Sequence, residues 1–168
     1  MESTVGSTRH IAYETPEIST EPLHNRHKYS LKIIGDGGIG YPGTPLPDEN
    51  HIRLVRMSRS SPDIIVLEWL TAPLAEAQEY FALSSVWGIP SDHGLLHHPS
   101  LNMTENLCIA LLRLAEMSPR LWWVDALCIN QTDKDEKSHQ ARMIGTIFGK
   151  ARQVRIWLGE DDEHTLRP

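Results

Sequence analysis

The chain contains 168 residues, which is enough for one domain with its own hydrophobic core. Its 16 basic and 22 acidic residues give a formal charge of −6, which argues against nucleic-acid binding through bulk positive charge. No apolar run is long enough to span a bilayer, and the first residues do not resemble a secretory signal. Two cysteines, Cys108 and Cys128, are too few for a disulfide framework and are expected to be inert core thiols. We therefore expect a cytoplasmic protein with no membrane span.

Residues 1–50 are expected to form a disordered or loop-rich leader. Residues 1–28 are rich in Glu, Ser, Thr, Pro and His and show no apolar periodicity. Residues 35–43 are rich in glycine, but neither a Gly-Lys-Ser/Thr sequence nor a helical pattern follows them. The phosphate-binding loop that they superficially suggest is therefore not expected. The folded domain is expected to occupy residues 51–168.

The first elements of this domain are predicted to be strands. Apolar and polar residues alternate over 51–57, which predicts a half-buried strand. The β-branched run over 63–70 predicts a second strand, and the short turn between them predicts a β-hairpin. Residues 80–85 predict a third strand, which glycine and proline end within 86–90.

Helices and strands are predicted to alternate after this point. A helix is expected to begin near Thr104, a good N-cap, because apolar residues follow at helical spacing. Residues 121–129 are apolar but for one carboxylate, which predicts a central strand covered by helices on both faces. A second helix, capped by Thr132 or Asp133, and a strand over 153–158 complete the pattern. The order from residue 80 predicts an α/β fold with a parallel sheet.

Three blocks of the sequence, in the right order, resemble the fungal heterokaryon-incompatibility (HET) domain. Residues 80–88 are similar to the family's Y-ALSYVWG block, and residues 104–111 to its T-NL--AL helix. Residues 121–160 resemble its LWIDAICINQ core and the helix and WLGE segment that follow. Ser85 stands where the family usually has tyrosine, so a hydroxyl or aromatic role at that position is not carried over.

The resemblance implies a parallel-sheet core like that of the Toll/interleukin-receptor (TIR) fold, which is flavodoxin-like, preceded here by the N-terminal β-hairpin. It implies a role in fungal allorecognition and programmed cell death, a form of innate immunity. The domain would act through association with other proteins of a cell-death pathway or with itself. Because the family generally continues well beyond Gly159, the domain is expected to be truncated at its C-terminus.

Two other interpretations stay open. Some TIR domains hydrolyse NAD with a glutamate, so a carboxylate at the carboxyl edge of the sheet would make this chain an NAD hydrolase. NAD would then be a substrate, and no cofactor is expected. No catalytic residue is carried over, because the strand after which the TIR glutamate lies is followed here by only about ten residues. An inactive truncated remnant is the other alternative.

The candidate site residues are those at the expected carboxyl ends of the strands, where open parallel sheets gather ligands, and on the helix that follows. Trp87 offers a stacking face, and Asn130 and Gln131 offer hydrogen-bond donors and acceptors. Both features would suit a nucleotide. The favoured role of Asn130 and Gln131 is nevertheless to build the turn into the second helix. Asp125, inside an apolar strand, would either accept backbone N–H bonds, the favoured role, or act as an orienting group or base. The full set comprises Ser84, Trp87, Gly88, Asp125, Asn130, Gln131, Glu136 and Gln140.

A structural role is favoured for one of these candidates, Glu136, and no metal-binding role is expected for three neighbouring histidines. Glu136 and Gln140 share one face of the second helix. Glu136 is expected to stabilise the N-terminus of that helix rather than to catalyse. His93, His97 and His98 do not have the spacing of a rigid metal site, so no metal is expected.

Overall fold

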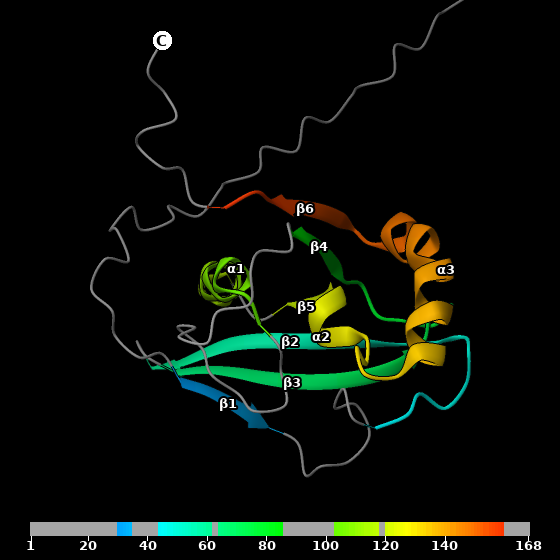
Figure 1. The fold of residues 1–168 in the computed structure, drawn as a ribbon. Helices are drawn as coiled ribbons and strands as arrows, with labels where there is room; N and C mark the ends of the chain where they lie inside the picture. Colours follow the sequence, from blue (N-terminus) through cyan, green and yellow to red (C-terminus); the bar gives the residue numbers. More distant parts are fainter. Residues whose placement is uncertain (1–29, 35–43, 62–63, 86–102, 118–119, 160–168) are drawn as a thin grey trace, which may run out of the picture.

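The structure is a computed structural model that describes residues 30–34, 44–61, 64–85, 103–117 and 120–159. The described residues form one mixed sheet of six strands together with three helices (Figure 1). In chain order the elements are β1 (Ser30–Ile34), β2 (His51–Ser61), β3 (Ile64–Pro73), β4 (Phe81–Ser85), α1 (Glu105–Glu116), β5 (Leu121–Val124), α2 (Asp125–Cys128), α3 (Lys134–Lys150) and β6 (Gln153–Trp157).

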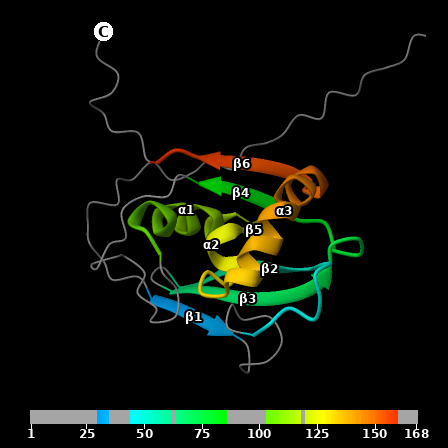
Figure 2. The ribbon, with the colours of Figure 1, turned by 45° about the vertical axis from the view of Figure 1, so that its right-hand side comes forward.

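The sheet has an antiparallel part and a parallel part. Its strand order is β1-β3-β2-β5-β4-β6. The long strands β2 and β3 form the expected antiparallel hairpin, and β2 also pairs antiparallel with β5. Strands β5, β4 and β6 are parallel to one another, and Figure 2 shows β4 and β6 running in the same direction along one edge. The predicted α/β class, hairpin and parallel core are therefore confirmed.

Two predictions of secondary structure need correction. Residues 30–34 lie in the segment expected to be disordered or loop-rich, but they form β1, which pairs in parallel with β3. The strand predicted over 121–129 is wrong in its second half, because β5 ends at Val124 and the short helix α2 follows at once. This helix is apolar on its buried side, with Leu127 and Cys128 fully covered, so its composition resembles that of a buried strand.

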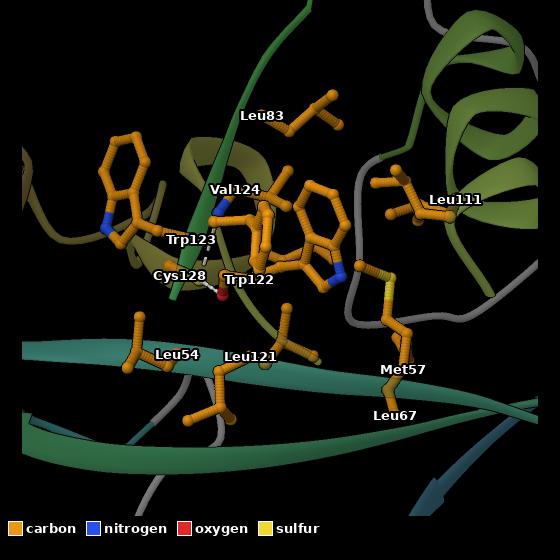
Figure 3. Close-up of a cluster of buried hydrophobic side chains, with 14 of the residues drawn as sticks. Leu54, Met57, Leu67, Leu83, Leu111, Leu121, Trp122, Trp123, Val124 and Cys128 are labelled. Carbon is orange, nitrogen blue, oxygen red and sulfur yellow. Dashed lines mark hydrogen bonds between the residues drawn. The ribbon is translucent and has the colours of Figure 1, made fainter. Parts of the chain in front are cut away.

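Helices cover both faces of the central strand β5, as predicted (Figure 1). Successive side chains of a strand point to opposite faces. Trp122 lies on the face that carries α1, near Leu111 and Met57 (Figure 3). Trp123 lies on the opposite face and packs edge-on against Phe148 of α3, with the ring centroids 5.4 Å apart. Both indoles are fully buried, so β5 is the centre of two cores, one on each side of the sheet.

The two longer helices begin at the expected caps. The Thr104 hydroxyl accepts the backbone N–H of Leu107 at 3.2 Å at the start of α1. The Asp133 carboxylate accepts the backbone N–H groups of Asp135 and Glu136, both at 3.0 Å, at the start of α3. Each cap satisfies helical donors that have no partner within the helix. None of the helices in the described part of the chain is both long enough and apolar enough to cross a membrane.

The outer strand β6 leaves apolar side chains uncovered. Its odd-numbered side chains face α1, where the indole of Trp157 donates to Asn106 Oδ1 at 2.8 Å. On the other face, the exposed fractions of Val154 and Ile156 are 41% and 72%, and that of Leu158, which follows the end of the strand, is 78%. Ile144 of α3 is also exposed. We call Ile144, Val154, Ile156 and Leu158 the β6 surface.

Candidate functional site

A buried ion pair joins β2 to the first turn of α3. The side chain of Arg53 is 0% exposed and that of Glu136 is 8% exposed. Arg53 Nη1 donates to Glu136 Oε1, and Nη2 donates to Oε2 at 3.0 Å, so the guanidinium grips the carboxylate with two parallel bonds. Glu136 Oε1 also accepts the backbone N–H of Asn130 at 2.8 Å. Both carboxylate oxygens are therefore occupied.

Arg53 also holds the segments around this pair. Its Nη1 donates to the carbonyl of Cys128 at the end of α2, at 3.2 Å, and its Nη2 donates to the carbonyl of Thr44. Within the described ranges no group accepts a bond from its Nε, which is buried. One guanidinium thus ties β2 to α2, α3 and the segment before β2. Glu136 lies in the first turn of α3, as expected, and pairs with Arg53, a partner that was not predicted.

The sequence signal for Arg53 was misleading. Arg53 lies between Ile52 and Leu54 in the alternating stretch that predicted a half-buried strand, which places arginine on the wet side. The structure buries β2 on both faces from Ile52 to Val55. A buried arginine requires a carboxylate partner, and Glu136, 83 positions further along the chain, supplies it.

Asp125 is the first residue of α2 and is half-buried, so it does not lie inside an apolar strand. Its Oδ1 accepts the backbone N–H of Ala126 at 2.7 Å. Its carbonyl accepts the N–H of Ile129 at 3.1 Å and the side-chain amide of Gln131 at 3.0 Å. The favoured role, acceptance of a backbone N–H, fits this geometry, although the donor belongs to the next residue.

Asn130 and Gln131 have the contacts of turn residues. Asn130 Oδ1 accepts from both the backbone N–H and the hydroxyl of Thr132, at 3.1 and 2.7 Å. Gln131 reaches back to Asp125 as described above. These bonds close the connection between α2 and α3, which matches the structural role that the sequence favoured for both residues.

The remaining candidates are dispersed. Gln140 is fully buried, and its Nε2 donates to the carbonyl of His51 at 2.9 Å, while its buried Oε1 has no partner among the described residues. Ser84 lies on β4, half-buried and paired in register with Ile156. Trp87 and Gly88 lie outside the described residues. The structure therefore brings together Asp125, Asn130, Gln131 and Glu136 around the end of β5, and Ser84 follows Leu83, the register partner of Val124 at that end.

A pocket of about 250 Å³ opens beside the ion pair, between the start of α3 and the segment before β2. Hydrogen bonds from the His51 side chain and the Asn50 N–H lower the pKa of Asp48, which lies on its wall. The lining residues are Pro45, Leu46, Asp48, Glu49, Asp133, Asp135, Glu136, His139 and Gln140. Five of these carry carboxylates, and such an acidic lining disfavours an anionic ligand such as a dinucleotide.

No metal-binding group of three or more His, Cys, Asp or Glu residues occurs in the described part of the chain.

Cys128 is an inert core thiol, as expected. It is fully buried and its Sγ accepts the backbone N–H of Val124 at 3.4 Å (Figure 3). Burial raises the pKa of the thiol to about 12, so the reactive thiolate is absent at neutral pH. Cys108 is also fully buried.

The fold and its central cluster define an α/β domain whose motif residues hold α2 and α3 against the end of β5. The sequence profile of the family described as heterokaryon incompatibility protein (HET) matches residues 80–168. Heterokaryon incompatibility protein 6, OR allele, of Neurospora crassa is 34% identical over 143 residues, which cover 72% of this chain and 21% of that protein. No solved structure matches. The chain belongs to the HET family, as the three sequence blocks predicted, and it spans about a fifth of the length of this relative.

Proposed function

We propose that the chain is an incompatibility-type signalling domain that acts in the cytoplasm through association with another protein of a cell-death pathway. Membership of the HET family and similarity to a heterokaryon incompatibility protein support the incompatibility-type function. Two buried cysteine thiols fit a reducing compartment.

The observation that carries association is the β6 surface. Monomeric proteins keep their large aliphatic side chains mostly covered, and contiguous uncovered ones mark interaction sites. Here Ile156 of β6 and Leu158, which follows the end of this strand, expose 72% and 78% of their area. Covering an aliphatic side chain of this size contributes about 1.5–3 kcal/mol. The β6 surface is thus the part of the described molecule with most to gain from a partner.

We also propose that the parallel part of the sheet is a TIR-like (flavodoxin-like) core. Flavodoxin-like sheets place their first parallel strand between the second and the third. The order β5-β4-β6 has this arrangement, because β4 comes first in the chain and lies between β5 and β6. In such a sheet the next strand position lies beyond β6, at an edge that accepts a strand.

The same contacts weigh against NAD hydrolysis by Glu136. A catalytic carboxylate must reach the substrate, whereas both oxygens of Glu136 are bonded to Arg53 and Asn130. The adjacent pocket is acidic, so it would repel the phosphates of a dinucleotide. Association through β6 explains why aliphatic side chains are exposed there, whereas catalysis by Glu136 would require a carboxylate that is free to reach a substrate.

The test is inducible expression of the chain in vegetative fungal cells, with colony survival and cellular NAD as readouts. We expect the unaltered chain to reduce survival at least tenfold. Ile156→Lys should abolish this effect, because it places a charge at the centre of the β6 surface. Ser138→Lys, which adds the same charge at an exposed position of α3, should remain as toxic as the unaltered chain.

Three outcomes would contradict the proposal. Full survival with the unaltered chain would favour the inactive remnant. Equal toxicity of Ile156→Lys at equal protein level would show that the β6 surface is not needed for the effect. A fall in NAD that precedes death and persists in Ile156→Lys would favour the hydrolase.

A further inference from the structure

We propose that the pocket beside the Arg53–Glu136 pair binds an organic cation, namely a primary ammonium group on a short aliphatic stem. No residue of the β6 surface lines this pocket, so the site goes beyond the proposed function and does not depend on it. Its lining combines uncompensated carboxylates, a buried acceptor without a partner and two apolar residues in one wall.

The lining carries more negative charge than the surrounding residues compensate. Five of its nine residues are Asp or Glu, and none is Lys or Arg. Arg53 compensates Glu136, through the two bonds described above. The carboxylates of Glu49 and Asp135 are instead exposed to solvent. A cleft lined by one sign of charge concentrates ions of the opposite sign, so this pocket attracts cations.

Gln140 supplies the buried acceptor. It is one of the lining residues, and its side chain is fully buried. Its Nε2 donates to the carbonyl of His51 at 2.9 Å, which fixes the amide with Nε2 towards β2, while Oε1 has no partner among the described residues. Buried acceptors in proteins are nearly always satisfied. A ligand with N–H donors would supply the missing partner, whereas an anion without a donor would not.

The arrangement of the acceptors favours an ammonium group over a metal ion or a guanidinium group. A metal ion needs several ligands that converge on one point, and no group of three or more His, Cys, Asp or Glu residues in the described ranges could hold one. A guanidinium binds best to a carboxylate through two parallel bonds, and Arg53 already binds the buried carboxylate of Glu136 in this way. An ammonium group is a compact charge with three donors, which can reach separate acceptors.

Pro45 and Leu46 would cover the aliphatic stem. They belong to the segment before β2, which lies against α3 because the carbonyl of Glu49 accepts a bond from His139 Nε2 at 2.6 Å (cyan in Figure 1). Aliphatic stems that carry a cationic head pack well along apolar surface. The volume of about 250 Å³ is below the roughly 300–1,000 Å³ of pockets for drug-sized ligands, so the pocket suits one small amine or one lysine side chain.

Titration of the full chain with butylammonium chloride, followed by NMR, tests the proposal. The signals of the Gln140 side-chain amide and of the Leu46 backbone should shift saturably, and binding should weaken as the salt concentration rises. Butanol has the same stem with an uncharged head, and pentanoate has an anionic head, so neither should bind. Putrescine and a blocked tripeptide with a central lysine distinguish the source of the ammonium group. Tighter binding of putrescine indicates a free amine, and tighter binding of the peptide indicates a lysine of another protein.

Variants of the lining test the contacts. Gln140→Met removes the acceptor but keeps a side chain of similar size, and should weaken binding by about tenfold. Glu49→Gln and Asp135→Asn each remove one exposed carboxylate and should weaken binding by about threefold. Glu79→Gln is the matched control, because Glu79 is also an exposed carboxylate but pairs with Arg152 and does not line the pocket. This variant should bind like the unaltered chain.

Absence of saturable butylammonium binding would overturn the proposal, as would equal binding of butanol. Equal affinity of Glu49→Gln, Asp135→Asn and Glu79→Gln would also overturn it. The expected losses in the first two variants alone would support it, even if Gln140→Met failed to fold, whereas a folded Gln140→Met with unchanged affinity would contradict the role of Oε1. Survival of cells that express Ile156→Lys is a separate readout, so this proposal and the proposed function can fail independently.

Discussion

The end of β5 and the edge of β6 differ in which kind of side chain they bury and which they expose. At the end of β5, charged and polar groups are buried, and Arg53, Glu136 and Asn130 bond to one another. At the edge of β6, apolar groups are exposed, and Ile156 and Leu158 touch little of the described molecule. The first region has the chemistry of an active site but the contacts of a structural joint. The second region has no polar side chains suited to catalysis, but its exposed apolar area could be covered by a partner.

This difference indicates that the motif residues and the residues that contact a partner are not the same. Asp125, Asn130, Gln131 and Glu136 all lie in the block that resembles the HET core, and their contacts hold α2 and α3 in place. We infer that the fold requires these residues, and we propose that the exposed side chains of β6 contact the partner. Variants of the two regions should therefore differ in kind, the first changing stability and the second changing association.

The largest effect is expected from Glu136→Gln. Breaking a buried ion pair leaves one charge uncompensated, which typically costs about 3–5 kcal/mol. Arg53 is 0% exposed, so solvent cannot replace the lost carboxylate. We expect the free energy of unfolding, measured by urea denaturation, to fall by this amount.

A matched pair of variants tests the cause of that loss. Asp135→Asn removes an exposed carboxylate from the same turn of α3 and should cost less than about 1 kcal/mol. Arg53→Met combined with Glu136→Leu removes both charges and should recover more than half of the loss. A double variant as unstable as Glu136→Gln would show that the uncompensated charge of Arg53 is not the cause of the lost stability.

Tyr80→Phe should have the next largest effect. Tyr80 lies just before β4, and its hydroxyl donates to the carbonyl of Ile147 in α3 at 2.6 Å, so it anchors the helix that leads into β6. Loss of this bond should lower the free energy of unfolding by about 1–1.5 kcal/mol near pH 7. Burial raises the pKa of Tyr80 from 10.0 to about 12 in the folded chain.

The sign of the pH dependence follows from that shift. The folded state holds the phenol proton more tightly than the unfolded state, so the stability from this group is complete below pH 10 and is lost as the pH rises towards 12. The difference in unfolding free energy between the unaltered chain and Tyr80→Phe should therefore shrink across this range. A difference that stays constant would contradict the assignment.

Asp133→Ala should cost about 1 kcal/mol, because its carboxylate caps α3 through the N–H groups of Asp135 and Glu136. Asp133→Ser, which retains a capping oxygen, should restore most of the loss. Thermal unfolding followed by circular dichroism would measure both. If serine were no better than alanine, the cap would not be the source of the effect.

Ile156→Lys should have the smallest effect on stability, within about 0.5 kcal/mol of the unaltered chain under conditions where both are monomeric. The side chain is 72% exposed, so the substitution removes little packing. Denaturation at low protein concentration would check this. A loss comparable to that of Glu136→Gln would mean that Ile156 supports the fold and would blur the contrast between the two regions.

The sequence predicted the hairpin, the parallel strands and the helix caps because each has a local signal. Thr104 and Asp133 are recognisable as caps from the residues that follow them, and Trp122 and Trp123 mark a strand covered on both faces. The short helix α2 was not predicted because four residues are too few to show a helical periodicity, and β1 lies in a stretch whose composition suggests a loop.

The candidate site was harder to predict, because its geometry depends on a contact between residues far apart in the chain. Arg53 and Glu136 are 83 positions apart, and nothing near Arg53 indicates that β2 is buried on both faces. The turn roles of Asn130 and Gln131 were favoured from sequence, since their bonds are local. The exposure of Ile156 was not foreseen, because its strand has the composition of a covered one.

Expression of the full chain and of Ile156→Lys in vegetative fungal cells tests the central claim most directly, with Ser138→Lys as the control for added charge. The account predicts that the unaltered chain and Ser138→Lys each reduce colony survival at least tenfold, and that Ile156→Lys, with unchanged secondary structure and an equal protein level, does not. Equal loss of survival with Ile156→Lys would contradict it, as would full survival with the unaltered chain.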